Sequence, residues 1–267
     1  MTGPVIDTPQ LTSVRNPRVI AVAALHDRRP RRSAGLTLIE GPAQIADAVA
    51  AGADLVDLYS LEPADVPVGS TAVVTTVSDA VLGRMAGTRH PRGPVAVVAI
   101  PASATLRPVD TVVLWDVSDP GNAGAVVRSA AAFGFDVAAT AGSTDVWSPR
   151  ALRAAAGAQF RTAVVELGDD PLAVLTGAGL TPLAAVVAGG GEVEDIASTD
   201  PVALIIGGEA HGLPEAVTSR STPVSLALDG GVESLNAAVA VGVLMYQLRK
   251  RRHPASSTVG GAPSPGR

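Results

Sequence analysis

Short apolar runs alternate along the first hundred residues with longer stretches in which apolar side chains recur at helical spacing. The short runs predict strands at 36–40, 55–59, 72–77 and 95–100. The longer stretches predict helices at 16–25, from 42 to about 52 and from 79 to 86, with Pro42 at a helix-start position. This alternation is typical of a compact α/β unit spanning residues 1–100.

A second unit of the same type follows residues 101–110, which contain two prolines and no periodicity and which we interpret as a linker. The continuous apolar run 111–116 predicts a buried parallel strand, and a helix is expected at 122–133. Further strands are predicted at 135–140, 162–166, 182–187, 202–206 and 222–228, and a last helix at 234–249. We expect this second unit to span 111–252 and the Pro-, Gly- and Ser-rich tail 253–267 to be disordered.

The net charge of −5 argues, taken alone, against a nucleic-acid partner. The charge is unevenly distributed, however: residues 11–32 carry +5, residues 84–107 carry +4, and residues 249–252 carry +4. A protein of net negative charge that carries basic patches can attract RNA to those patches, while the negative potential of the rest of its surface disfavours nonspecific binding. The charge pattern therefore leaves an RNA partner open.

Several classes of protein are disfavoured by what the sequence lacks. It has no cysteine, which excludes a disulfide scaffold, a thiolate metal site and a cysteine nucleophile. Its first residues show no basic segment followed by an apolar run, so we expect no signal peptide. The longest uncharged stretch, 171–191, is interrupted by Pro182 and several glycines and predicts helix, turn and strand rather than a membrane span. We expect a cytoplasmic protein with no metal.

Three polar loops of the second unit follow predicted strands, where open α/β sheets place their ligands. The first begins Asp119-Pro120-Gly121-Asn122 and is followed by Arg128 on the next helix. The simplest interpretation of this loop is a tight turn followed by one surface arginine. The backbone N–H groups of the loop could also bind an anion. The loop has neither a phosphate-binding Gly-Lys-Ser/Thr nor a GxGxxG pattern, which disfavours an ATPase or a dinucleotide oxidoreductase.

The second loop, 207–213, joins paired glycines to Glu209 and His211. By itself Glu209 would be a solvated loop acid, and His211 has no evident catalytic partner in the sequence. The third loop, 226–236, ends in Glu-Ser-Leu-Asn before the last helix. Its simplest interpretation makes Ser234 the helix cap and Asn236 a first-turn residue.

Taken in order, Asp-Pro-Gly-Asn-x-Gly-x-x-x-Arg, Gly-x-Glu-x-x-Gly-Leu and Glu-Ser-Leu-Asn resemble the SpoU (TrmH-like) RNA 2′-O-methyltransferases of the SPOUT superfamily. The segment 148–158, with Ser-Pro-Arg and Ala-Gly-Ala, is also similar to that family. The motifs at 16–19 and 38–42 resemble its L30e-like N-terminal substrate-binding domain. The resemblance covers roughly residues 13–250.

The resemblance implies an α/β fold in which a parallel-sheet domain with a deep trefoil knot follows a smaller L30e-like α/β domain that binds the RNA substrate. It implies a homodimer that uses S-adenosylmethionine as methyl donor. The implied catalytic residues are Asn122, Arg128, Glu209, Ser234 and Asn236. The implied cofactor-binding residues are Gly207, Gly208, Leu226, Leu228 and Leu235. RNA contacts are expected from Arg15, Arg18, Arg28, Arg29, Arg31, Arg32, Arg150 and Arg153.

The implied reaction is methylation of a ribose 2′-OH, with 23S rRNA as the first-choice substrate and tRNA as the alternative. A non-catalytic RNA-binding protein that keeps the fold is the competing class. We expect Arg128 to clamp a phosphate with its planar guanidinium, since its pKa is too high for an ordinary base. We expect no DNA partner and no membrane association.

Overall fold

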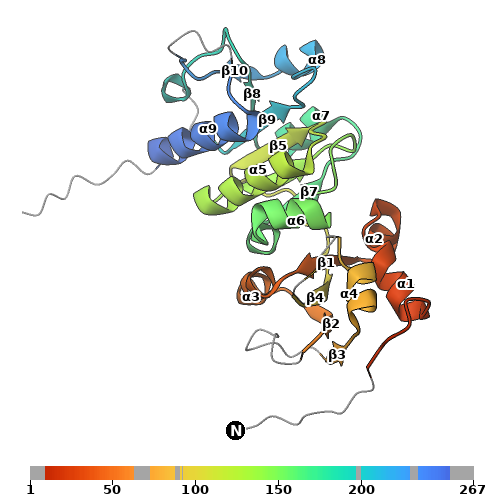
Figure 1. Cartoon of the computed structure of the whole chain (residues 1–267). Coiled ribbons are helices and arrows are strands. Elements are labelled where there is room, and N and C mark those ends of the chain that lie inside the picture. The colour runs from red at the N-terminus through yellow and green to blue at the C-terminus, as the bar shows by residue number, and fades with distance from the viewer. Residues whose placement is uncertain are drawn as a thin grey trace, which may run out of the picture.

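The structure is a computed structural model that describes residues 10–62, 73–87, 91, 93–196, 200–228 and 234–252. Residue 72, the first residue of the strand predicted at 72–77, and the tail 253–267 lie outside the described residues. Two sheets form two stacked units, with the N-terminal unit at the bottom of Figure 1 and the C-terminal unit above it. An α/β fold of two units is what the hydrophobic pattern predicts.

The N-terminal unit is built on a four-stranded mixed sheet of order β1-β4-β2-β3. Only the β2–β3 pairing is parallel among its described pairs. A short helix, α2, was not predicted as a separate element; it follows α1 through the basic cluster and ends at Gly35, which has a φ of 65°. The elements are α1 (Pro17–Ala24), α2 (Arg28–Ala34), β1 (Leu36–Glu40), α3 (Pro42–Ala50), β2 (Leu55–Ser60), β3 (Val74–Thr76), α4 (Asp79–Met85) and β4 (Val95–Ala99).

The C-terminal unit is built on a six-stranded sheet of order β10-β8-β9-β5-β6-β7, in which every pairing is parallel. Its strands are β5 (Thr111–Trp115), β6 (Asp136–Ala139), β7 (Val164–Glu166), β8 (Thr181–Ala185), β9 (Val202–Gly207) and β10 (Thr222–Val224). Its α-helices are α5 (Pro120–Phe133), α6 (Pro149–Ala155), α7 (Pro171–Gly177), α8 (Glu215–Thr218) and α9 (Ala237–Arg252). Two 3₁₀ turns lie at Ala158–Arg161 and Val193–Asp195.

Alternate residues of the central strands face opposite layers of the C-terminal unit. Val112, Leu114 and Leu204 belong to the core shared with α5 and α9, whereas Val113 and Ile205 pack with the residues of α7. Both faces of the sheet are therefore covered, which explains why these strands are continuous apolar runs rather than alternating ones. α5 and α9 lie side by side over one face (Figure 1).

Three predicted boundaries differ from the observed ones, two because of helix caps and one because of the hydrogen bonds after β10. α5 begins at Pro120 rather than at residue 122, because the Asp119 carboxylate accepts the Asn122 N–H at 2.8 Å. α9 begins after Asn236, whose Oδ1 accepts the N–H groups of Ala238 and Val239, so the cap is Asn236 and not Ser234. The strand predicted at 222–228 ends at Val224, because the next N–H group, that of Ser225, donates to the Gly191 carbonyl in the segment after β8.

The two units share a core and several polar contacts. One hydrophobic cluster contains Ile45 and Leu58 of the N-terminal unit together with residues of the parallel sheet. α6 packs against β1 at the boundary, and the Thr37 hydroxyl donates to the Trp147 carbonyl at 2.6 Å. The stretch 101–110 contains no helix or strand and lies along the C-terminal unit, where Arg107 bonds both carboxylate oxygens of Asp136 at 2.8 to 3.1 Å.

Candidate functional site

The sheet order places the first two polar loops beside each other although they are about ninety residues apart in sequence. β5 and β9 are hydrogen-bonded neighbours, and the chain builds β6 and β7 on one side of β5 before it crosses to β8 and β9 on the other. Their carboxyl ends form a topological switch point, the usual ligand position in open parallel sheets. The loop after β5 leads to Asn122, and the loop after β9 carries Glu209.

Three polar side chains from the three loops form one hydrogen-bonded chain. The Asn122 amide donates to Glu209 Oε1 at 2.5 Å, and Asn122 Oδ1 accepts from the Asn236 amide at 3.1 Å. Asn236 Oδ1 in turn accepts the backbone N–H of Ala238 at 2.9 Å, at the start of α9. Because each amide donates on one side and accepts on the other, the chain fixes the orientation of both asparagine side chains.

Backbone crowding explains the paired glycines of the second loop. A Cβ on Gly207 would lie 2.2 Å from the carbonyl carbon of Gly212, and a Cβ on Gly208 would lie 2.5 Å from the carbonyl oxygen of Asp116. The loop therefore closes on itself and on the end of β5, and any side chain at either position would displace it. This close approach sets the position of Glu209, the next residue.

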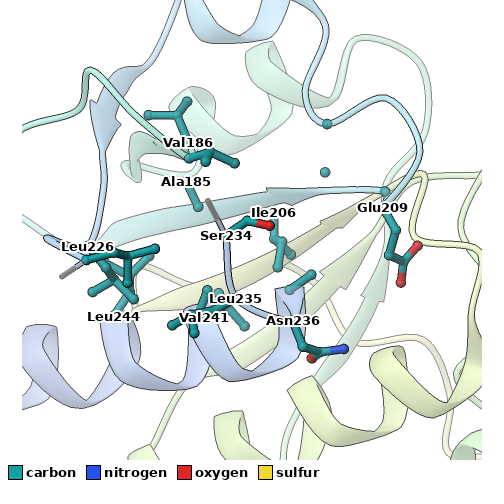
Figure 2. A pocket seen from close by; sticks show the side chains of 17 residues that line it. Ala185, Val186, Ile206, Glu209, Leu226, Ser234, Leu235, Asn236, Val241 and Leu244 are labelled. Atoms are coloured by element: carbon teal, nitrogen blue, oxygen red, sulfur yellow. The ribbon is translucent and has the colours of Figure 1, made fainter. Parts of the chain in front are cut away.

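A cavity of about 510 Å³ opens beside this hydrogen-bonded chain. Glu209 and Asn236 lie at one end of it, and the aliphatic side chains of Leu226 and Leu244 lie at the other (Figure 2). Its walls come from the ends of β8 and β9, from the chain after β10, and from α9. One polar end and an aliphatic body are typical of a site for a small organic ligand.

All five residues predicted to bind a cofactor line this cavity, together with three of the predicted catalytic residues. They are Gly207, Gly208, Leu226, Leu228 and Leu235, with Glu209, Ser234 and Asn236. Sequence reasoning missed the wall formed by Ala185, Val186 and Val187, and the α9 residues Ala240, Val241 and Leu244. The apolar run that ends β8 is the sequence signal for that wall, but it is indistinguishable from an ordinary buried strand.

Comparison with known proteins agrees with the geometry. Residues 110–246 match the model of the SpoU rRNA Methylase family, and residues 16–96 match an MRM3-like substrate binding domain. An uncharacterized tRNA/rRNA methyltransferase of Synechocystis sp. is 32% identical over 94% of this chain and 97% of its own length. The chain belongs to the SpoU rRNA methylase family.

Two further relatives cover nearly the whole chain. The 23S rRNA (guanosine(2553)-2′-O)-methyltransferase RlmP of Bacillus subtilis is 26% identical over 90% of this chain and 99% of its own. A solved AdoMet-bound rRNA methyltransferase from Sinorhizobium meliloti superposes with a TM-score of 0.79 at 26% identity, covering 92% of this chain and 98% of that one. The family resemblance drawn from the three loops is confirmed, and so is the fold of a parallel-sheet SPOUT domain preceded by a smaller α/β domain.

Arg128 is the predicted catalytic residue that the structure places apart from the others in this SpoU-family chain. It is exposed on α5, one turn after Gly124, which packs against α6, and it does not line the cavity. No hydrogen bond or ion pair of its guanidinium occurs among the described residues. Arg128 is therefore available to an external anion rather than to the cavity.

The predicted RNA-contacting arginines of the N-terminal unit have different surroundings. Arg31 is buried, with its guanidinium bonded to Asp145 and to the carbonyls of Leu25 and His26, so it has no surface left for RNA. Arg32 pairs with Glu166 at an exposed position. Arg15 and Arg29 are exposed, and Arg28 makes one long contact, 3.4 Å, to the Ser143 carbonyl.

Arg18 is exposed and contacts Asp57 and the buried Tyr59. It donates to Asp57 at 2.5 Å and lies 5.2 Å from the centre of the Tyr59 ring. Burial, followed by the negative charge of Asp57, raises the pKa of the Tyr59 hydroxyl to about 12. Tyr59 therefore stays protonated at neutral pH and serves as an aromatic platform for the arginine.

His211 is exposed and lies outside the cavity lining, as expected for a loop histidine. Within the part of the chain that the structure describes, no three His, Cys, Asp or Glu side chains gather closely enough to hold a metal ion. The described helices include none long and apolar enough to cross a membrane.

Proposed function

We propose that this chain transfers a methyl group from S-adenosylmethionine to a ribose 2′-OH of RNA. The observation that carries the proposal is the Glu209–Asn122–Asn236 chain at the polar end of an otherwise aliphatic cavity. The relatives support it, since one is named as a 2′-O-methyltransferase of 23S rRNA and one is solved with AdoMet bound.

The cavity fits the cofactor on two grounds, its size and its lining. Its volume of about 510 Å³ lies within the range usual for sites of that size, roughly 300–1,000 Å³. Its lining combines a polar end, at Glu209 and Asn236, with an aliphatic body, which suits a ligand that has both polar and apolar parts. We assign Gly207, Gly208, Leu226, Leu228 and Leu235 as its holding residues. When bound, S-adenosylmethionine supplies an electrophilic methyl group on a sulfonium that leaves as a neutral thioether.

The residues of this chain then have to orient and deprotonate a poor nucleophile, the ribose hydroxyl. We assign the Glu209–Asn122–Asn236 chain to positioning of the ribose, and Ser234, which lines the cavity, to completing the pocket. Arg128 would hold a neighbouring phosphate through two parallel N–H bonds, and a phosphate oxygen or a transiently perturbed Arg128 would take the proton. Its position outside the cavity suits contact with RNA rather than with the cofactor.

We propose that residues 1–100 form the RNA-binding unit, with Arg15, Arg18, Arg28, Arg29 and Arg32 as its phosphate contacts. Residues 101–110 are the linker, and residues 111–252 are the catalytic unit. Arg31 is not among the contacts, because it is buried in an ion pair between the units. We further propose that the protein acts in the cytoplasm, where such an RNA substrate is found.

A homodimer is proposed from the surface of α5 and α9. Val239, Val243 and Tyr246 are exposed on α9, and they border a hollow of about 490 Å³ that also includes Phe133 of α5. The Phe133 and Tyr246 rings lie 5.9 Å apart between centroids. An exposed aromatic and aliphatic groove is typical of a surface that a second copy covers.

We further propose that the C-terminal unit contains a trefoil knot. It is supported by the way residues 186–191 surround β10: the Val186 N–H donates to the Val224 carbonyl at 2.9 Å, and the Ser225 N–H donates to the Gly191 carbonyl at 3.1 Å. A Cβ on Gly190 would lie 2.5 Å from the Val224 carbonyl carbon, so the segments touch through backbone.

Radiolabelled methyl transfer tests the proposed function. The full chain is incubated with methyl-labelled S-adenosylmethionine and either bacterial 23S rRNA or tRNA transcribed in vitro, and the RNA is then hydrolysed with alkali. Because alkaline cleavage needs a free 2′-OH, label in an alkali-resistant dinucleotide of rRNA is the expected result. Label in tRNA alone would move the substrate to the alternative class. Absence of cofactor binding by calorimetry would instead favour the non-catalytic RNA-binding protein.

A further inference from the structure

A second cavity, of about 470 Å³, lies between the two units. The turn between α1 and α2 lines it from the N-terminal unit, and the start of α6 lines it from the C-terminal unit. We call it the interdomain cleft. It shares no lining residue with the cavity assigned to the cofactor.

The floor of the interdomain cleft is already neutralised. Arg31 and Asp145 both line it, and each is less than a tenth exposed. Asp145 Oδ2 accepts from Arg31 Nε at 2.9 Å and from Nη2 at 2.7 Å. These two charges therefore satisfy each other and are not available to a ligand.

The rim of the cleft carries three further arginines, one from the N-terminal unit and two from the C-terminal unit. Arg28 makes a 3.4 Å contact to a carbonyl, and Arg150 makes a 3.4 Å ion pair with Asp119 in which both side chains are exposed. Arg153 pairs with Glu40 at 3.2 Å. The cleft-lining carboxylate outside these pairs is Asp27, and His26 adds a ring whose Nε2 lies 2.9 Å from the Met85 carbonyl oxygen.

Arg28 and Arg150 are therefore weakly engaged guanidinium groups that line the same cleft, one from each unit. Long, exposed ion pairs contribute little and are readily exchanged for a better anion. A guanidinium binds a phosphate through two parallel N–H bonds, which neither arginine makes to its present protein partner.

The cleft adjoins the proposed catalytic loop. Pro120, the first residue of α5, lines the cleft, whereas Asn122, two residues later, takes part in the catalytic chain. Asp119 connects the two, since one of its oxygens accepts the Asn122 N–H at 2.8 Å and the other pairs with Arg150. An anion held by Arg150 would therefore lie beside the loop that positions the ribose.

We propose that the interdomain cleft binds the phosphodiester backbone of the substrate RNA beside the target nucleotide, with Arg28 of one unit and Arg150 of the other each holding a phosphate. This inference rests on the proposed function. It assigns the boundary between the units, rather than the N-terminal unit alone, as the place where the RNA strand enters the site.

The test compares the wild-type chain with the double variant Arg28→Gln/Arg150→Gln. The matched control is Arg84→Gln/Arg161→Gln, which removes one exposed arginine from each unit outside the cleft. The affinity for in vitro transcribed bacterial 23S rRNA is measured by filter binding across a KCl series. We expect the cleft variant to lose about tenfold or more in affinity and to reduce the salt slope by about one to two, with the control nearly unchanged.

A companion variant, Arg28→Lys/Arg150→Lys, keeps both charges and is expected to restore the salt slope but only part of the affinity. Equal affinity loss in the cleft variant and the control would overturn the proposal. Inorganic phosphate that displaces the RNA from the wild-type chain at low millimolar concentration would also overturn it, in favour of a small-anion site. Failure of the proposed function is distinguishable, because it would appear as RNA binding and cofactor binding without methyl transfer by the wild-type chain.

Discussion

Arg31 and Asp145 form a buried ion pair that joins the two units of the protein. Two N–H groups of the guanidinium meet the same carboxylate oxygen, and a third nitrogen donates to the carbonyls of Leu25 and His26 at 2.7 and 2.9 Å. The other Asp145 oxygen accepts the Trp147 N–H at 3.0 Å. The pair thus ties the turn before α2 to the loop that leads into α6.

Removing one member of this pair should strongly destabilise the fold. Arg31→Ala leaves the Asp145 carboxylate buried without its cation, which costs about 3–5 kcal/mol. The control Arg32→Ala removes an ion pair that is exposed on both sides, so its free energy of unfolding should change by less than about 1 kcal/mol. Urea unfolding measures both, and equal stability of the two variants would contradict the burial argument.

Asn122→Ala should reduce turnover more than cofactor binding. The substitution removes the link between Glu209 and Asn236, and misplacement of reacting groups by about 1 Å can cost about 10²-fold in rate. Asn122→Asp keeps the size but places a carboxylate against Glu209, so it should be no more active. Single-turnover methyl transfer gives the rate and calorimetry gives the cofactor affinity; a large affinity loss with an unchanged rate would rule out the positioning role.

The variant Arg128→Lys tests whether Arg128 acts through two parallel N–H bonds to a phosphate or through its positive charge alone. Lysine keeps the charge but lacks the planar fork, so we expect turnover with RNA to fall about tenfold or more while cofactor affinity stays the same. Arg128→Gln, which also removes the charge, should be lower still. Near-wild-type turnover of the lysine variant would refute the clamp.

Gly208→Ala should impair cofactor binding through the backbone. The added Cβ would lie 2.5 Å from the Asp116 carbonyl oxygen, so the loop that carries Glu209 must move. The control is Gly168→Ala, whose Cβ would meet no atom within 4 Å. We expect the affinity for S-adenosylmethionine to fall about tenfold in the first variant and to stay unchanged in the second, as measured by calorimetry.

Tyr246→Glu should yield a monomer if α5 and α9 form the dimer surface. A carboxylate in an apolar interface is desolvated without a partner, which opposes association. Val174→Glu places the same charge at another exposed helix position, on α7, and should leave the oligomeric state unchanged. Light scattering after size exclusion compares them; a wild-type monomer, or a dimer that survives Tyr246→Glu, would remove this surface as the interface.

The elements that local patterns control were predicted well. β1 was predicted at its observed bounds, and Pro42 and Gly134 mark the start of one helix and the end of another as their backbone preferences require. The short helices α2 and α6 were not predicted, because four of the seven residues of α2 are arginine and α6 is an Ala-rich segment without a clear apolar stripe.

The functional site, too, could be predicted only in part. From the sequence alone we could predict the α/β class, the three polar loops and, through their motifs, the family and eight of the seventeen residues that line the cofactor cavity. The tertiary structure was needed to see that Glu209, Asn122 and Asn236 form one hydrogen-bonded chain. It was also needed to see that Arg31 is buried in an ion pair and that Arg28 and Arg150 line the same cleft. The physical reason is that a charge has the same appearance in sequence whether it is solvated, paired or poised for a ligand. Its role depends on which carboxylate and which backbone carbonyl the fold brings within about 3 Å of it.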